Sequence, residues 1–201
     1  MTSDTLPASV PTKGERTRQA LLGAAIARFS TDGLRGVALS DVARDVGVTP
    51  AAVYAYFPGK EALFAAAVDT DADALVEVAL QAVQHGRFTG DWAALIQLLL
   101  DALPDHPLAR RVLSGLEPES TGRLLDIPAL ARLRTQLAEV IADDQRAGAV
   151  RREIDPSSHA DGLVTIVLAL LIGILQTGGQ PHPDRAPGVI SVLEASLRPP
   201  A

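Results

Sequence analysis

Apolar positions recur with the period of an α-helix along most of this chain. The first stripe, at the spacing i, i+3, i+4 and i+7, consists of Leu22, Ala25, Ile26 and Phe29. A second and shorter stripe consists of Leu39, Val42, Ala43 and Val46. No segment shows the sustained period-two alternation that indicates a half-buried strand. The pattern therefore predicts an all-α protein.

Residues that start and stop helices stand at the ends of these stripes. Thr12 and Glu15 have the spacing of a capping box, in which two side chains satisfy backbone amides at a helix start. Gly33 and Gly47 follow the two stripes and suit the left-handed conformation that ends helices. Thr49, followed by proline, is a strong signal for a new helix. Three helices are therefore predicted within residues 12–59.

Helical patterns continue to the end of the chain. Residues 1–11 carry no periodic pattern, and we expect them to form a flexible arm. The other predicted helices cover residues 50–56, 60–84, 91–103, 106–116, 127–147, 156–176 and 184–197. Prolines and glycines stand at their boundaries, as is typical of helix ends. The total is about nine helices.

Two short helices joined by a tight turn around Gly47 form a predicted helix-turn-helix. Ala43 is small enough for a close approach of the two helices, and Val53 packs the second helix back onto the first. In DNA-binding versions the second helix enters the major groove with its N-terminal residues at the base edges. The same spacing also occurs as a plain packing device, so both interpretations stay open.

The first residues of the second helix suit a close approach to DNA. The free amides beside Thr49 form a helix N-terminus that favours phosphate. Pro50, Ala51 and Ala52 have small side chains, and the alanine methyl groups can contact the thymine methyl group.

Longer side chains follow directly. Tyr54 and Tyr56 carry hydroxyl groups that can reach phosphates, and Lys60 is a further candidate phosphate contact. Alternatively, the two tyrosines are half-buried core residues with polar tips.

The net charge of the whole chain argues against a DNA partner, but the distribution of charge along the chain permits one. The 201 residues include 24 acidic and 18 basic side chains, a formal net charge of −6, which disfavours a polyanionic partner. Residues 1–60, however, hold seven basic and five acidic side chains, a net charge of +2. Residues 61–201 hold eleven basic and nineteen acidic ones, a net charge of −8. The acidity therefore belongs to the second part of the chain.

The sequence from residue 17 to residue 64 resembles the tetracycline-repressor (TetR) family of bacterial transcription regulators. The matching segments read TRQALLGAAIARFSTDGLRGV and LSDVARDVGVTPAAVYAYFPGKEALF. The resemblance implies a three-helix DNA-binding head, residues 12–59, and a ligand-binding and dimerisation body, residues 60–201. It also implies a homodimeric repressor that a small-molecule effector releases from a palindromic operator in double-stranded DNA.

By position in the family pattern, Thr49, Tyr54, Tyr56 and Lys60 are expected to contact phosphate. Ser40 and residues 50–52 are expected to face the bases or the DNA backbone.

The chain departs from the family pattern at two places. Val37 and Ala38 stand where the family usually has Ser or Thr, so we expect Ser40 to cap a slightly shorter helix. Ala55 replaces a common histidine or tryptophan, which removes one groove contact.

A single short recognition helix touches few bases, so a two-fold dimer is expected. Helices that are apolar all round predict a four-helix interface at the C-terminal end. The expected interface residues are Leu163, Ile166, Val167, Leu170, Leu171, Ile174, Leu193 and Leu197. Alternatively, these two helices only close the core of the protomer.

The sequence indicates the ligand site less clearly than the DNA-binding residues. Candidates for a cavity wall are Phe88, Trp92 and His106, with Arg110 for an acidic effector. Trp92 is alternatively a core anchor, and Arg110 part of a solvated face. The chain has no cysteine and four scattered histidines, so no metal site and no cofactor are expected.

Two other classes of function are alternatives to a DNA-binding regulator. An enzyme is least favoured, because the chain lacks a glycine-rich phosphate loop, a Gly-x-Ser-x-Gly elbow and a His-Glu-x-x-His pair. A helical dimer that binds protein through its head is the other alternative. The longest apolar stretch, Leu163–Leu175, is shorter than the roughly 20 residues that span a bilayer. We therefore expect a cytoplasmic protein without a membrane partner.

Overall fold

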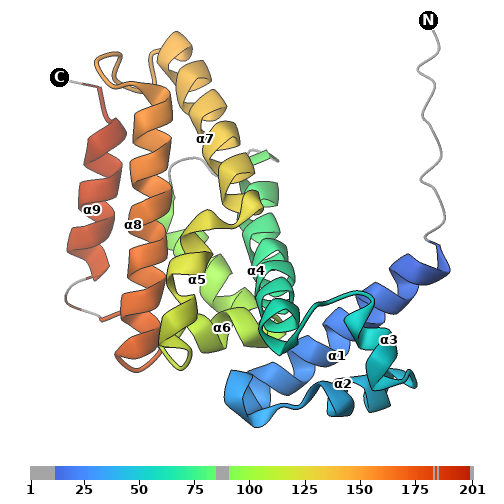
Figure 1. Cartoon of the computed structure of the whole chain (residues 1–201). Coiled ribbons are helices and arrows are strands. Elements are labelled where there is room, and N and C mark those ends of the chain that lie inside the picture. Colours follow the sequence, from blue (N-terminus) through green and yellow to red (C-terminus); the bar gives the residue numbers. More distant parts are fainter. Residues whose placement is uncertain (1–11, 85–90, 183, 185, 200–201) are drawn as a thin grey trace, which may run out of the picture. The chain divides into compact units, whose positions relative to one another are not determined.

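The computed structural model describes residues 12–84, 91–182, 184 and 186–199. These residues form nine α-helices and three short 3-10 turns, and no strand occurs among them, so the all-α prediction is confirmed. The helices are α1 (Lys13–Gly36), α2 (Leu39–Val46), α3 (Pro50–Tyr54), α4 (Lys60–Gln84), α5 (Trp92–Ala102), α6 (Pro107–Leu113), α7 (Pro128–Ala147), α8 (Pro156–Gln176) and α9 (Ala186–Leu197) (Figure 1). The arm predicted for residues 1–11 lies outside the described part of the chain.

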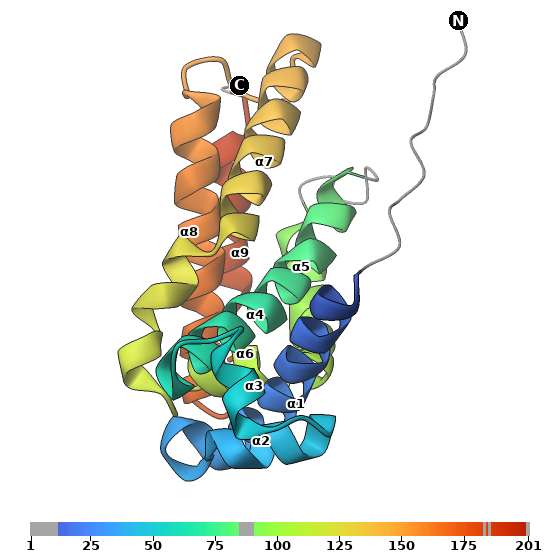
Figure 2. The same cartoon turned by 45° about the vertical axis from the view of Figure 1, so that its right-hand side comes forward.

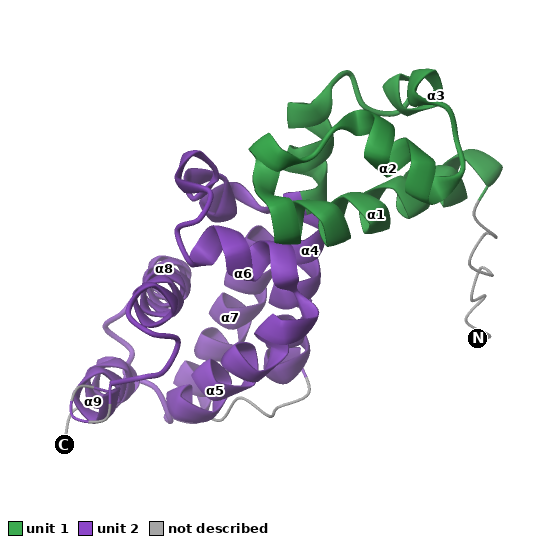
Figure 3. Cartoon of the chain, turned by 90° about the horizontal axis from the view of Figure 1, so that it is seen from below, with its two compact units in different colours: residues 1–67 green, residues 68–201 purple. Residues whose placement is uncertain are grey.

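The chain divides into two compact units, which part within α4 between Ala67 and Val68 (Figure 3). This division lies eight residues beyond the boundary predicted between residues 59 and 60. The reason is packing, because the first two turns of α4 belong to the core of the first unit. Phe64 of α4 meets Phe29 of α1 edge to face, with ring centroids 5.0 Å apart.

In the first unit, local signals decide where α1 begins and bends. The capping box is complete, since Thr12 Oγ1 accepts from the Glu15 amide and Glu15 Oε2 accepts from the Thr12 amide. Leu22, Ala25 and Phe29 of the predicted stripe are buried. Gly33 has the expected positive φ of 71°, but its ψ of 175° is extended and not left-handed helical, so the chain bends there and the helix resumes for one more turn to Gly36.

In the second unit, α7 and α8 run side by side over most of their length (Figure 2). Helix α8 also packs against α5 and α6, and its His159 Nε2 lies 3.1 Å from Ser196 Oγ of α9, which in turn contacts α5. Helix α8 has a mean hydropathy of 2.0 over its most apolar window and, by length and composition alone, could cross a membrane. That is weak evidence, because core helices pass the same test, and α8 buries Leu163, Val167 and Leu171 in this unit.

Acidic residues of α4 hold the starts of two other helices. Asp71 Oδ2 accepts hydrogen bonds from the amides of Leu108 and Ala109 in α6, both at 2.8 Å. Asp73 Oδ1 accepts from the amide of Ala129 in α7 at 3.1 Å. Neither helix has a side-chain cap from its own N-terminal residue. Helix α4 therefore supplies the caps that the local sequence of α6 and α7 lacks.

Candidate functional site

The turn between α2 and α3 has the tight geometry expected at Gly47. Gly47 is left-handed (φ 72°, ψ 31°), and the Val48 amide donates to the Ala43 carbonyl at 3.0 Å. Ala43 and Val53 are completely buried where the two helices meet. A residue with a Cβ would be strained at Gly47, so the glycine fixes the angle at which α3 leaves the turn.

Helix α3 starts as its sequence predicts. The Thr49 side chain accepts from the Ala52 amide at 3.2 Å, and Pro50 is the first helical residue. The helix ends at Tyr54, two residues earlier than expected. Thr49, Pro50 and Ala51 are exposed and Ala52 is half-buried, which leaves this end of the helix open to a partner.

The two tyrosines differ in their surroundings. Tyr54 is 56% exposed, which removes the alternative that it is a half-buried core residue. Tyr56 is half-buried, and its hydroxyl lies close to Gly14 at the beginning of α1. Lys60 begins α4 and is half-buried. All three belong to the first unit: Tyr54 ends α3, the Tyr56 hydroxyl lies near the start of α1, and Lys60 begins α4.

The expectation that Ser40 caps α2 is wrong. The helix begins at Leu39 with Ala38 as its extended N-cap, and no side chain caps it. The Asp41 amide instead donates to the Ala38 carbonyl at 3.0 Å. Ser40 is an exposed residue inside the first turn, so its hydroxyl points to solvent from the helix that precedes α3.

Ion pairs use part of the positive charge of the first unit. Arg28 binds both carboxylate oxygens of Asp45, with Nη2–Oδ1 at 2.8 Å, and Arg44 binds Asp41 at 2.9 Å. The hydrogen bond from Arg28 lowers the pKa of Asp45 and raises that of Arg28 itself. The Arg28–Asp45 pair links α2 to α1, whereas the Arg44–Asp41 pair lies within α2. Both pairs reduce the positive charge that is available to a polyanion.

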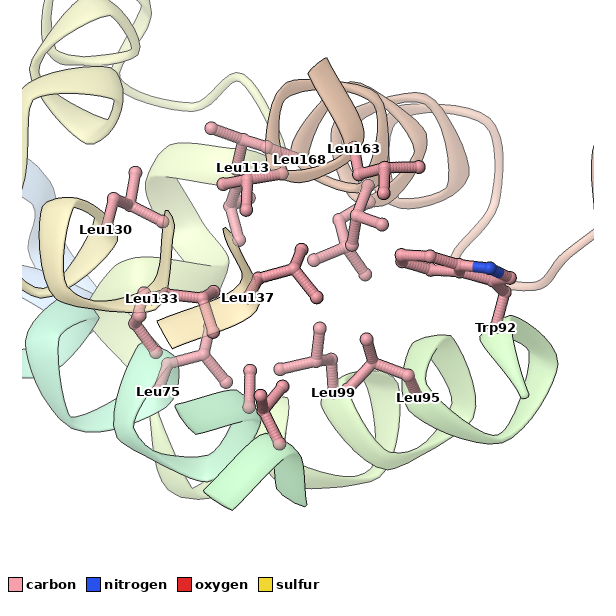
Figure 4. A pocket seen from close by; sticks show the side chains of 16 residues that line it. Leu75, Trp92, Leu95, Leu99, Leu113, Leu130, Leu133, Leu137, Leu163 and Leu168 are labelled. Atoms are coloured by element: carbon pink, nitrogen blue, oxygen red, sulfur yellow. The ribbon is translucent and has the colours of Figure 1, made fainter. Parts of the chain in front are cut away.

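The second unit contains an apolar cavity of about 80 Å³ (Figure 4). All sixteen side chains that line it are apolar and come from α4, α5, α6, α7 and α8. Leu137 of α7 and Leu99 of α5 point toward its centre, and Trp92 stands at one side (Figure 4). The wall offers no charged group, so it suits hydrocarbon.

The residues predicted for a ligand site do not come together. Trp92 lines the cavity and is buried. His106 lies beside Asp71, with Nδ1 and Oδ1 3.5 Å apart, and Arg110 is exposed beside a separate depression. Phe88 lies outside the described residues. The leucines of the wall were missed because, in sequence, a cavity lining looks the same as a packed core.

The predicted dimer residues divide into two groups. Leu163, Val167, Leu171 and Leu193 are buried within the protomer, and the first three line the cavity. We exclude these four from the dimer surface, because a side chain already buried has no surface left for a partner. Ile166 is 44% exposed, and Leu170, Ile174 and Leu197 are half-buried. Val192 of α9, which the prediction omitted, is 69% exposed.

Similarity to known proteins agrees with this geometry. The sequence pattern of the family "Bacterial regulatory proteins, tetR family" matches residues 21–67. The chain is 31% identical to the HTH-type transcriptional regulator RutR of Escherichia coli (strain K12), covering 94% of this chain and 87% of that protein. It is 26% identical to the uncharacterized HTH-type transcriptional regulator YdgC of Bacillus subtilis (strain 168), over 93% and 95% of the two chains.

Solved structures share the fold. One is a TetR-family transcriptional regulator from Pectobacterium atrosepticum, with a TM-score of 0.66 and 22% identity. The match covers 93% of this chain and 95% of that one. The chain belongs to the TetR family of bacterial regulatory proteins and is a DNA-binding transcriptional regulator.

Proposed function

We propose that the protein is a homodimeric repressor, released from a palindromic operator by a small-molecule effector. The observation that carries the proposal is the set of exposed and half-buried residues on and beside α3, a helix whose direction the turn at Gly47 fixes. Ser40, Pro50, Ala51 and Ala52 would face the groove. Thr49, Tyr54, Tyr56 and Lys60 would hold phosphates on either side.

The surface of α8 supports the homodimer. Only 28% of the most apolar 18-residue stretch of α8 is buried in the protomer, although that stretch has a mean hydropathy of 2.0. Exposed apolar side chains of this density mark interaction sites in soluble proteins. A second copy would cover Ile166, Leu170 and Ile174 on α8 and Leu197 and Val192 on α9. Two heads then read two half-sites.

Helix α4 is the proposed route from effector to DNA. It begins with Lys60, a proposed phosphate contact, and four of its later residues line the apolar cavity. An effector that changes the cavity wall would therefore act on the helix that carries part of the DNA site. Such a coupling lowers affinity for DNA only if the effector prefers the conformation that binds DNA poorly.

The proposal places the protein in the cytoplasm, where its DNA is, and gives it a binding role instead of a catalytic one. The named relatives are transcriptional regulators, which supports this reading.

The test is DNA binding measured over a range of salt concentrations, using fragments from the region that flanks the gene. Tyr54→Ala and Lys60→Ala should weaken binding on all fragments, and Lys60→Ala should reduce the slope of log K against log salt by about 1. Arg152→Ala, which removes one exposed positive charge from the second unit, is the matched control and should leave the slope unchanged.

Unchanged operator binding in both head variants would show that α3 is not the reading helix. Binding to the flanking region that does not weaken with salt would instead favour a head that binds protein.

A further inference from the structure

The cavity and the cleft next to it differ sharply in polarity. The cavity wall is apolar throughout, whereas an outer cleft of about 580 Å³ also has charged walls. Its charged residues are Asp91, Asp144, Glu194 and Arg198. Trp92 and Leu137 line both spaces and therefore stand between them.

The volume limits what the cavity holds. Apolar cavities of ~150 Å³ in protein interiors stay dry and bind benzene. At about 80 Å³, this cavity has room for a short hydrocarbon segment but not for a whole drug-sized molecule. The atoms around a void lack contact partners, so filling it with hydrocarbon restores dispersion contacts. The remainder of a larger ligand would lie in the outer cleft.

The charges select against anions. A charged group inside the cavity would lose its hydration and find no counterion among the lining residues. Three carboxylates and one guanidinium line the outer cleft, and Arg198 already lies 3.7 Å from Glu194. A carboxylate or phosphate on the ligand would meet a negative potential there.

We propose that the effector site takes an uncharged molecule with a short hydrocarbon segment, and that it rejects the carboxylate of the same length. The hydrocarbon occupies the cavity between α4, α5, α7 and α8, and an uncharged polar remainder occupies the outer cleft. This proposal specifies the effector class of the proposed function. It rests on that function only for the consequence of binding, which is the release of DNA.

The chain offers its own reporter, because Trp92 is its only tryptophan and stands on the wall. Bromine quenches indole emission only near contact, so brominated probes report entry. The full-length protein is titrated with 6-bromo-1-hexanol and with 6-bromohexanoate at pH 7, and 1-hexanol serves as the bromine-free control. We expect saturable quenching by the bromoalcohol and at least tenfold weaker binding of the bromocarboxylate.

A matched pair of variants on α5 locates the site. Leu99→Phe fills the cavity, whereas Leu98→Phe makes the same change at the neighbouring residue, which is 40% exposed. We expect Leu99→Phe to weaken bromoalcohol binding at least fivefold and Leu98→Phe to change it less than twofold. Leu137→Phe, with folding of each variant checked by circular dichroism, provides a second filled cavity if Leu99→Phe does not fold.

Quenching that does not saturate, quenching that is equal in the two α5 variants, or equal binding of the carboxylate would each overturn the proposal. DNA binding separates this failure from that of the proposed function. Saturable binding in the cavity without a loss of operator affinity would refute the effector response and leave the site assignment standing.

Discussion

Gly47 is the residue on which the presentation of α3 depends most directly. Its φ of 72° lies in the left-handed region, and a Cβ added there would meet no atom within 4 Å. Any cost of a substitution is therefore one of backbone conformation and not of crowding.

We predict that Gly47→Ala lowers the free energy of unfolding by roughly 1–2 kcal/mol, the cost of placing alanine in this left-handed conformation. Gly23→Ala is the matched control, since Gly23 is exposed inside α1 with no atom within 4 Å of an added Cβ. Alanine should stabilise α1 there by roughly 0.5–1 kcal/mol. Urea denaturation of both variants measures the difference, and a stabilising Gly47→Ala would contradict the assigned turn.

The Arg28–Asp45 pair predicts how the first unit responds to acid. Hydrogen bonding by Arg28 lowers the pKa of Asp45 below its ordinary value near 4. A carboxylate with a lowered pKa in the folded state stabilises the protein above the unfolded value, and this contribution disappears as pH falls through the folded value.

Asp45→Asn should therefore lose stability at neutral pH and show a smaller further loss below pH 4 than the unchanged protein. Urea midpoints measured from pH 7 to pH 3 test this, with Arg28→Gln expected to behave in the same way because it removes the partner. Parallel pH profiles for Asp45→Asn and the unchanged protein would show that the pair does not contribute.

At the scale of elements, α4 organises the second unit through its carboxylates. Asp71 is 5% exposed and is the one charged side chain classed as buried among the described residues. Its partners, the amides of Leu108 and Ala109, belong to residues that are themselves fully buried. Without Asp71 the start of α6 would keep two amides with neither water nor a carboxylate.

We predict that Asp71→Ala lowers the free energy of unfolding by about 2–4 kcal/mol, from two buried amides left without an acceptor. Asp71→Asn, which keeps one side-chain oxygen, should cost less. Asp69→Ala, two residues earlier on α4, is the control, because its pair with Arg123 is partly exposed and should contribute only about 0–1 kcal/mol. Equal losses for Asp71→Ala and Asp69→Ala, measured by urea denaturation, would contradict the capping role.

At the scale of the whole molecule, the exposed apolar face of α8 and α9 is the surface that a second copy of the chain is proposed to cover. We predict that Ile166→Glu raises the dissociation constant of the proposed dimer at least tenfold, because a buried carboxylate without a partner costs several kcal/mol. Sedimentation velocity over a range of protein concentrations measures this. Leu116→Glu, at a 60% exposed position outside this face, should leave the association unchanged. A monomeric unchanged protein, or no effect of Ile166→Glu, would remove α8 from the interface.

The amino-acid sequence by itself determined the helices and the head. Capping boxes, N-terminal prolines and left-handed glycines act within a few residues, so Thr12, Gly47 and Pro50 could be assigned correctly from neighbours alone. The segment from residue 17 to residue 64 was also specific enough to indicate the family. Ser40 was misassigned as a cap because a nearby polar residue is only a candidate, and the backbone at Ala38 was already extended.

Only the tertiary structure decided which apolar residues face which neighbour. On α8, Leu163 and Ile166 look equivalent in sequence, yet one lines the cavity and the other is exposed, because α5, α6 and α7 cover only one side of the helix. The caps of α6 and α7 come from Asp71 and Asp73, 37 to 56 residues away along the chain. Helical periodicity reports that a side chain is apolar, but burial, cavities and distant hydrogen bonds depend on how whole helices pack together.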